Sequence, residues 1–255
     1  MISIVTDDEA KQEIIWGIGF YLENNLDYES KIMKLIERKA FPFIISGLKL
    51  KSKQTIRPIL RILVHASYSS VKEALKYFEY DLLKLIASLL DLDVLVWAHD
   101  ICWMFANLLA SSGYGFYDKL FEPSIINNLI KWITDKRSQI VVKSAVWTIG
   151  MFIKMGTEEP IEKLIVEYNI IEVLMFTMHS GSENVVKEIL DCFESLLEFS
   201  DKYTSEGMNA VAIQMSRSKY FEFFENLQMV NSTEIYQKVA HLIVKYFHGI
   251  IEHSA

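Results

Sequence analysis

Hydrophobic residues recur every three or four positions along most of the chain, which is the spacing of amphipathic helices. Only 10 Gly and 4 Pro interrupt the 255 residues, so the pattern predicts helices rather than strands. A first helix is expected from about residue 6. The order short, short, long then repeats four times, and after a polar loop at 200–207 the chain ends on a helix at 232–251. The repeated ranges are 28–38, 40–48 and 53–67; 69–79, 80–90 and 94–110; 114–122, 124–133 and 136–155; and 157–168, 170–179 and 183–199.

One position recurs when the long helices are aligned by their apolar residues. Successive occurrences are 45, 42, 44, 44 and 50 residues apart, and the residues are Trp16, Arg61, Trp103, Trp147, Asp191 and His241. A period of roughly 40–47 residues with three helices per unit is typical of armadillo repeats, which stack because no unit buries its own apolar face. The sequence therefore predicts an all-α, right-handed superhelical solenoid of about five to six repeats, the first incomplete. We expect residues 1–255 to form a single domain whose third helices line a concave groove.

The composition narrows the kinds of partner. Acidic residues outnumber basic ones by 33 to 26, for a net charge of −7, which suits basic peptides better than nucleic acid. Cys102 and Cys192 stand alone and are expected to be buried thiols in a reducing compartment. The N-terminus lacks the pattern of a signal peptide, and the longest uncharged run is too short and polar to span a bilayer. We expect a soluble, intracellular protein without a membrane partner.

The segment around Trp103 carries the most specific candidate chemistry. Asp100, Trp103 and Asn107 are spaced to share one face of a helix. An amide can pair with a peptide backbone, an indole attracts a cation along a lysine stem, and a carboxylate meets the ammonium. A single occurrence would be better explained by ordinary packing of the indole and solvation of the amide. Its recurrence at a fixed period favours a binding surface for an extended basic peptide.

The positions flanking the recurring residue define the expected surface. Three residues earlier stand Glu13, Pro58, Asp100, Ser144, Glu188 and Lys238, and four residues later stand Phe20, His65, Asn107, Met151, Ser195 and Lys245. The groove should be acidic and aromatic at its middle and basic toward its C-terminal end. The indoles of Trp103 and Trp147, on neighbouring repeats, are expected to hold one lysine or arginine stem between them. The predicted peptide-binding residues are Trp103, Asn107, Trp147, Asp100, Arg61, His65, Trp16 and Glu13.

A run of motifs resembles a known family along the whole chain. The motifs are Cys102-Trp103-x-x-x-Asn107, Ser144-Ala-Val-Trp147-Thr-Ile-Gly150 with the following Gly156-Thr-Glu-Glu-Pro-Ile-Glu162, Trp16 with Phe20, Pro58-Ile-Leu-Arg61, and Glu234-Ile-Tyr-Gln-Lys238 with Tyr246-Phe247. Taken in their order along the chain, these motifs resemble the C-terminal half of importin-alpha (karyopherin-alpha), the armadillo adaptor that reads nuclear localisation signals. The resemblance implies that Trp103, Trp147 and Asn107 form the family's minor signal site, with Arg61 nearby.

The resemblance also implies that the last repeats lie where the family meets its export receptor. The sequence departs from the family at several points. The segment that engages importin-beta and the repeats of the major signal site are not recognised. His65 and Met151 stand where the family has Asn, and Ser144 stands where it often has an acid. A thioether cannot replace an amide as a peptide clamp, so Met151 weakens the expected site.

The sequence leaves three functions open. The leading expectation is an importin-alpha-like adaptor that binds basic cargo peptides and works in the cytoplasm and nucleus. A second is a scaffold that has lost signal binding and binds a folded partner, or itself, through its first helix or its C-terminal repeats. A third is a partner of an export receptor that binds through residues 236–247. No nucleophile motif, metal-ligand spacing or cofactor motif is recognisable, so we expect neither an enzyme nor a bound cofactor or metal.

Overall fold

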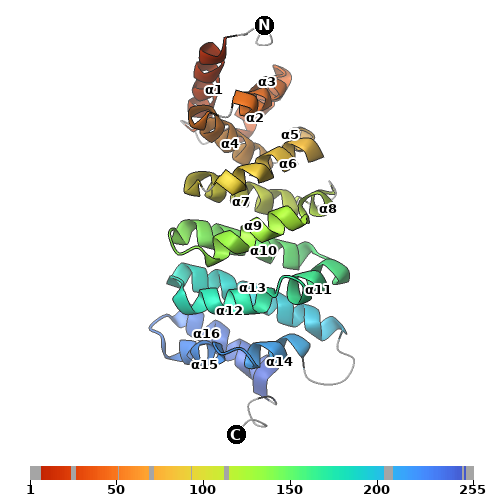
Figure 1. The fold of residues 1–255 in the computed structure, drawn as a ribbon, viewed down its shortest axis with the longest axis vertical. Coiled ribbons are helices and arrows are strands. Elements are labelled where there is room, and N and C mark those ends of the chain that lie inside the picture. Colours follow the sequence, from red (N-terminus) through yellow and green to blue (C-terminus); the bar gives the residue numbers. More distant parts are fainter. Residues whose placement is uncertain are drawn as a thin grey trace. The chain divides into compact units, whose positions relative to one another are not determined.

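The computed structural model describes residues 7–23, 27–50, 52–68, 72–92, 94–111, 115–203, 209–248 and 250. Every element of regular secondary structure within these residues is a helix and none is a strand, which confirms the all-α prediction (Figure 1). Contacts divide the chain into two compact units, residues 1–120 (unit 1) and residues 121–255 (unit 2). That both units form one domain stays a prediction.

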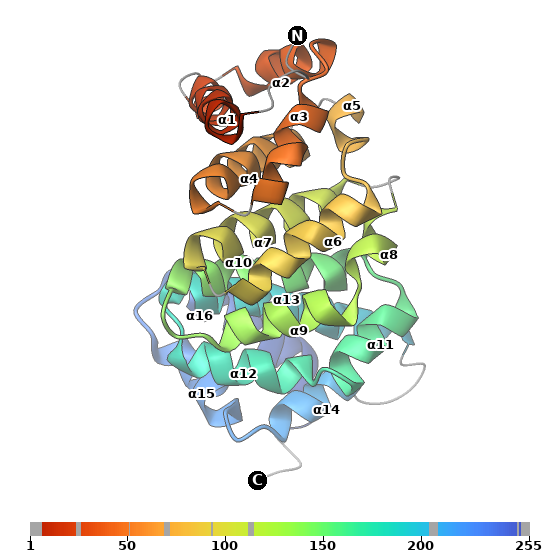
Figure 2. The same ribbon diagram turned by 45° about the horizontal axis from the view of Figure 1, so that its top comes forward.

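Unit 1 follows the predicted order of short and long helices. Its elements are α1 (Asp8–Glu23), α2 (Tyr28–Glu37), α3 (Phe41–Ser46), η2 (Gly47–Leu50), α4 (Lys53–Tyr68), α5 (Lys72–Leu75), α6 (Tyr80–Ser88), η3 (Leu89–Leu92), α7 (Leu95–Ala110) and α8 (Phe116–Leu120). The long helices α1, α4 and α7 pack in succession, α4 lying between the other two (Figures 1 and 2). The helix expected over 69–79 ends earlier than predicted, because α5 stops at Leu75 and residues 76–79 are not helical; residues 69–71 lie outside the described part.

Unit 2 repeats the same order. Its elements are α9 (Pro123–Thr134), α10 (Gln139–Met155), α11 (Glu158–Val166), α12 (Ile170–Ser180), α13 (Glu183–Tyr203), α14 (Ala210–Ser216), α15 (Phe221–Asn226), η4 (Leu227–Met229), α16 (Thr233–Leu242) and the π-helical η5 (Ile243–Phe247). The long helices α10, α13 and α16 pack in succession. The polar loop was expected to begin at Ser200, and this was wrong: buried Ser200 continues α13 to Tyr203. The rest of that loop, 204–207, lies outside the described residues.

Small residues lie where the long helices cross. A Cβ atom added at Gly19 on α1 would lie 3.2 Å from the Pro58 Cβ of α4, and one added at Gly150 on α10 would lie 3.0 Å from the Cys192 Sγ of α13. Larger side chains would push these helices apart, so the glycines permit the close approach. Both cysteines are buried, as expected.

The apolar face of each long helix forms the core, and the recurring position lies outside it. On α7, Ile101, Met104, Phe105 and Leu108 are fully buried, whereas the Trp103 side chain is 44% exposed. Trp16 is similarly exposed, Arg61 and Trp147 are half-buried, and Asp191 and His241 are exposed. The recurrence read from the sequence therefore marks a surface stripe on the long helices.

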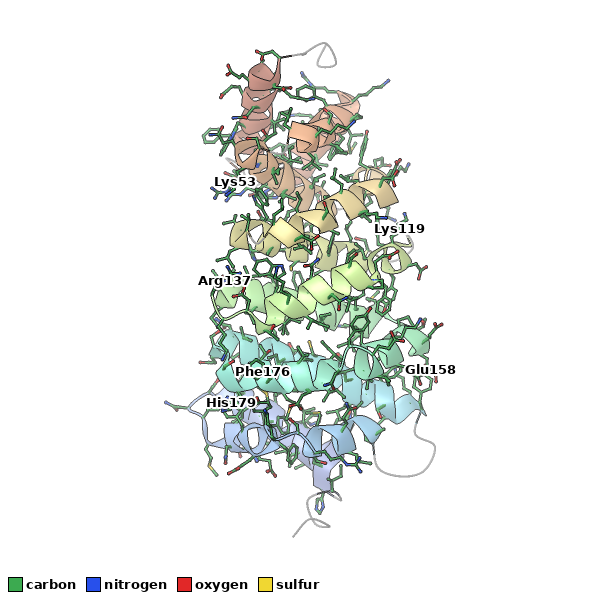
Figure 3. The ribbon with its side chains drawn as sticks, viewed as in Figure 1. Lys53, Lys119, Arg137, Glu158, Phe176 and His179 are labelled. Atoms are coloured by element: carbon green, nitrogen blue, oxygen red, sulfur yellow. The ribbon has the colours of Figure 1, made fainter. Side chains whose placement is uncertain are left out.

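Aromatic contacts also join the short helices of unit 2. Phe176 and His179 on α12 are labelled in Figure 3. The His179 ring centroid lies 5.0 Å from that of Phe223 on α15, and the Lys136 Nζ lies 5.3 Å from the Phe176 centroid. These side chains partner one another and hold α15 against α12.

No helix in the described part of the chain is long and apolar enough to cross a membrane.

Candidate functional site

A pocket of about 320 Å³ opens on the surface of unit 1, and we call it the α4–α7 pocket. Helices α4 and α7 supply most of its lining, and the end of α1 and the start of α2 complete it. The lining residues are Glu23, Tyr28, Arg61, Val64, His65, Tyr68, Asp100 and Trp103. Four of the predicted binding residues, Arg61, His65, Asp100 and Trp103, thus lie around one cavity.

Aromatic rings form much of this lining. Tyr28 and His65 stack with ring centroids 4.3 Å apart and planes 12° from parallel. Asp27 fixes the start of α2, and therefore Tyr28, because its carboxylate caps the helix by accepting from the Ser30 amide. The Trp103 indole meets the His99 ring edge-on at 5.5 Å and 61°. The pocket therefore offers fixed aromatic surfaces to a ligand.

The charges around the pocket leave one acid in excess. Arg61 forms a hydrogen-bonded ion pair with Glu23, so these two charges offset each other. The Asp100 Oδ2 is buried and has no hydrogen-bond partner among the described residues. Burial raises the pKa of Asp100, against the lowering effect of His99, Arg61 and nearby Arg57. Burial likewise lowers the pKa of His65, so its imidazole is mainly neutral at pH 7.

Asn107 does not present its amide to the solvent as the sequence pattern led us to expect. It is 9% exposed, and its Nδ2 donates to the Ser67 hydroxyl on α4 at 3.3 Å. Four residues advance the helix by about 400°, which places Asn107 about 40° around from Trp103. Because of that offset, the Asn107 side chain lies between α7 and α4. Asn107 therefore stabilises the helix pair rather than the pocket surface.

Glu13 and Trp16 lie on α1 and do not line this pocket. Both are exposed, and Trp16 has Phe20, 66% exposed, one turn further along the helix. Trp16 and Phe20 are therefore two exposed aromatic side chains of α1. The part of Glu13 and Trp16 in peptide binding stays a prediction.

Two lining residues were missed although the sequence contained a signal for them. Glu23 follows Trp16 by seven residues, and Tyr68 follows Arg61 by seven. Seven residues are close to two helical turns, so these positions extend the recurring stripe. Tyr28 carried no such signal, because it belongs to a short helix.

A second cavity of about 330 Å³, the α10–α13 pocket, lies on unit 2. Its lining residues are Trp147, Gly150, Met151, Lys154, Glu188, Asp191, Cys192, Glu194 and Ser195. Its acids are paired within the protein. The Lys238 Nζ lies 2.8 Å from Glu194 Oε2 and also bonds Asp191, and the Lys143 Nζ lies 3.4 Å from Glu188. The expected acidic middle of the groove is thus neutralised in this unit by lysines.

Ser144, one turn before Trp147, is buried. Its hydroxyl donates to the Ile140 carbonyl at 3.0 Å, within α10. Met151 does line the pocket, beside Trp147. The amide expected from the resemblance is therefore replaced here by a thioether, which offers no useful hydrogen bond to a peptide. Since Trp103 and Trp147 belong to different units, the paired-indole expectation stays a prediction.

Comparisons with known proteins identify the fold. No protein-family model matches the sequence, and no curated protein matches it. Among solved structures, the chain is similar to a designed armadillo repeat protein in complex with the peptide (KR)4, at a TM-score of 0.76 and 22% identity over 94% of this chain and 95% of that one. It is also similar to computationally designed armadillo repeat proteins for modular peptide recognition (TM-score 0.76, 20% identity, 94% of each chain). An engineered protein matches at a TM-score of 0.74 and 16% identity, over 95% of each chain.

The chain therefore has the armadillo-repeat fold, an α-solenoid. These structures point to no catalytic family. They support the armadillo part of the resemblance noted in the sequence, and they do not single out the importin-alpha family.

Proposed function

We propose that this chain is a peptide-binding adaptor whose α4–α7 pocket receives a cationic side chain of an extended basic peptide. The observation that carries this proposal is the pairing of a half-exposed indole, Trp103, with a carboxylate oxygen of Asp100 that has no partner among the described residues. An indole face and an uncompensated acid together attract a cation with an aliphatic stem. The net charge of −7 favours the approach of such a peptide.

The similar structures support the same class of ligand. One of them binds an alternating lysine–arginine peptide, and another belongs to proteins designed for modular peptide recognition. A single cation–aromatic contact contributes only about 0.5–2 kcal/mol, so one pocket gives weak binding. Useful affinity requires further contacts along the stripe, for which Trp16, Trp147 and Glu13 are the candidates.

We further propose that the peptides are nuclear-localisation-type signals of cargo proteins, and that the chain acts in transport between cytoplasm and nucleus. The run of motifs resembling importin-alpha supports this narrower function. The departures at His65, Met151 and Ser144 bear against tight binding of ordinary signals. Nuclear accumulation of a fluorescent cargo carrying a lysine-rich signal, measured with wild-type protein and with Trp103→Ala, tests it. Equal accumulation with both would refute the transport function.

The binding proposal is tested by fluorescence anisotropy of a labelled lysine–arginine peptide at low salt, where charge contributes most. Trp103→Ala should weaken binding about fivefold or more, because it removes the exposed indole. Leu85→Ala is the matched control, since Leu85 is 39% exposed on α6 and lines neither pocket. Wild-type affinity no tighter than that of Trp103→Ala would refute the proposal.

A second candidate function is a scaffold that binds a folded partner or an export receptor through the C-terminal repeats. It is favoured by the pairing of Lys238 with Asp191 and Glu194, which occupies the acids of the α10–α13 pocket. Apolar side chains are exposed nearby in sequence, including Tyr236, 48% exposed, and Val244, 71% exposed. Partner binding that survives Trp103→Ala and is lost in Tyr236→Ala would establish this function instead.

A further inference from the structure

The lining of the α4–α7 pocket suits a cation that carries no hydrogen-bond donors. We propose that this pocket prefers an N-methylated lysine side chain, trimethyllysine above all, to unmodified lysine. The inference rests on the proposed peptide-binding function and specifies the side chain that the site selects. It follows from the aromatic lining, the supply of acceptors and the balance of charge.

The aromatic groups give a methylated ammonium its contacts. The stacked rings of Tyr28 and His65 and the half-exposed indole of Trp103 belong to one lining, and Tyr68 adds a fourth ring at the end of α4. Aromatic faces attract quaternary ammonium groups through the ring quadrupole, and methyl groups make close apolar contact with the same faces. The lining therefore matches both the charge and the apolar shell of such a group.

The supply of acceptors argues against an unmodified ammonium. A lysine ammonium has three N–H donors that need acceptors once water is displaced. Of the two carboxylates in the lining, Glu23 already accepts from Arg61 through one oxygen, and the unpartnered Oδ2 of Asp100 is buried, so a bound ammonium finds few acceptors in the lining. Trimethylation keeps the positive charge and removes every donor. The methylated side chain thus avoids a desolvation cost that the unmodified one would incur.

The balance of charge in the lining favours a cationic ligand. Glu23 and Arg61 offset each other, and His65 is mainly neutral, so ionised Asp100 leaves the lining negative. Burial raises the pKa of this carboxyl, against the opposing effect of His99, Arg61 and Arg57. The fixed positive charge of a bound trimethylammonium group would offset the Asp100 carboxylate without a directed hydrogen bond.

Three peptides that differ in one side chain test the inference. The first carries lysine, the second trimethyllysine, and the third a neutral isostere in which a quaternary carbon replaces the charged nitrogen. Isothermal titration with wild-type protein should give trimethyllysine about three- to tenfold tighter binding than lysine, and tighter binding than the isostere. This ranking needs no variant, so it does not depend on the folding of a mutant. Trp103→Ala should remove the ranking, and Leu85→Ala should retain it.

The outcomes separate the inference from the function on which it rests. Should lysine bind as tightly as trimethyllysine while Trp103→Ala still weakens the lysine peptide, the inference fails and the peptide-binding function stands. Equal binding of the neutral isostere and trimethyllysine would also overturn the inference, because the pocket would then select shape alone. If none of the three peptides distinguishes wild type from Trp103→Ala, both proposals fail.

Discussion

The Lys238 ammonium on α16 lies 2.8 Å from the Glu194 carboxylate on α13, and it also bonds Asp191. A lysine of the protein therefore occupies two acids that line the α10–α13 pocket. In the α4–α7 pocket, Asp100 keeps one carboxylate oxygen without a hydrogen-bond partner among the described residues. Each cavity is lined by one tryptophan and by acids, and in the α10–α13 pocket a lysine of the protein pairs with two of these acids.

Removing that internal cation should open the α10–α13 pocket to a basic ligand. The test uses a Trp103→Ala background, in which the α4–α7 pocket no longer contributes its indole to binding. In this background, Lys238→Ala should tighten binding of a lysine–arginine peptide about three- to fivefold. Lys187→Ala is the control, because it removes the same charge while Lys187 pairs with Glu183 and Glu234, outside the pocket. Equal affinities for the two variants would show that only net charge matters.

The hydrogen bond between Asn107 and Ser67 should contribute to stability and not to binding. Asn107→Ala is expected to lower the free energy of unfolding by about 1 kcal/mol and to leave peptide affinity within about twofold. Urea denaturation of Asn107→Ala, Ser67→Ala and the double variant measures the coupling between the two side chains, which should be about 0.5–1 kcal/mol. Fully additive effects, or a large loss of affinity in Asn107→Ala, would contradict this assignment.

Two glycines of α1 should respond oppositely to the same substitution. Gly17→Ala should stabilise the protein by about 0.5–1 kcal/mol, because alanine favours a helix and nothing lies within 4 Å of the new methyl group. Gly19→Ala should destabilise by about 1–2 kcal/mol, because its methyl group would lie 3.2 Å from Pro58 Cβ. Thermal unfolding compares them. A stabilising Gly19→Ala would mean that α1 does not pack on α4 as described.

Asp100→Asn should separate stability from binding. The pKa of Asp100 is raised by burial in the folded protein, so the ionised carboxylate disfavours folding above that pKa. Replacing it with a neutral amide should raise the free energy of unfolding at pH 7 by about 1 kcal/mol and weaken binding of a basic peptide. The stability gain should narrow as the pH falls toward the raised pKa. A variant that is both less stable and fully active in binding would contradict this role.

Peptide binding should weaken in mildly acidic solution. Asp100 loses its charge at a pH above the ordinary value of 3.8, because its pKa is raised. His65 gains charge only below the ordinary value of 6.5, because its pKa is lowered. Both changes disfavour a cationic ligand, so the affinity should fall between about pH 6.5 and 4. Asp100→Asn should flatten this profile, and an unchanged profile in the variant would exclude Asp100 as the group responsible.

The helix order and the surface stripe could be predicted because both depend on local spacing. The apolar period fixes which face of each helix is buried, so Trp103 was correctly expected outside the core and Ile101 and Phe105 within it. The repeat length then indicated that consecutive repeats stack. The fold class required no long-range information beyond this recurrence.

The remaining features depend on residues far apart in the sequence. Buried Asn107 donates a hydrogen bond to Ser67, 40 positions earlier, and Lys238 reaches Asp191 across 47 positions. Tyr28 lines the α4–α7 pocket from a short helix that the recurring stripe does not include. A periodic pattern predicts which face a residue lies on, and it does not predict the partner that meets it there.

Fluorine NMR of protein labelled with 5-fluorotryptophan tests the central claim most directly, because the chain has five tryptophans. Trp103 is exposed, whereas Trp97 and Trp132 are buried, at 4% and 0% exposure, and serve as internal controls. Titration with a lysine–arginine peptide should shift the Trp103 resonance saturably and leave the Trp132 resonance in place. A Trp103 resonance that does not move at saturating peptide would contradict the account.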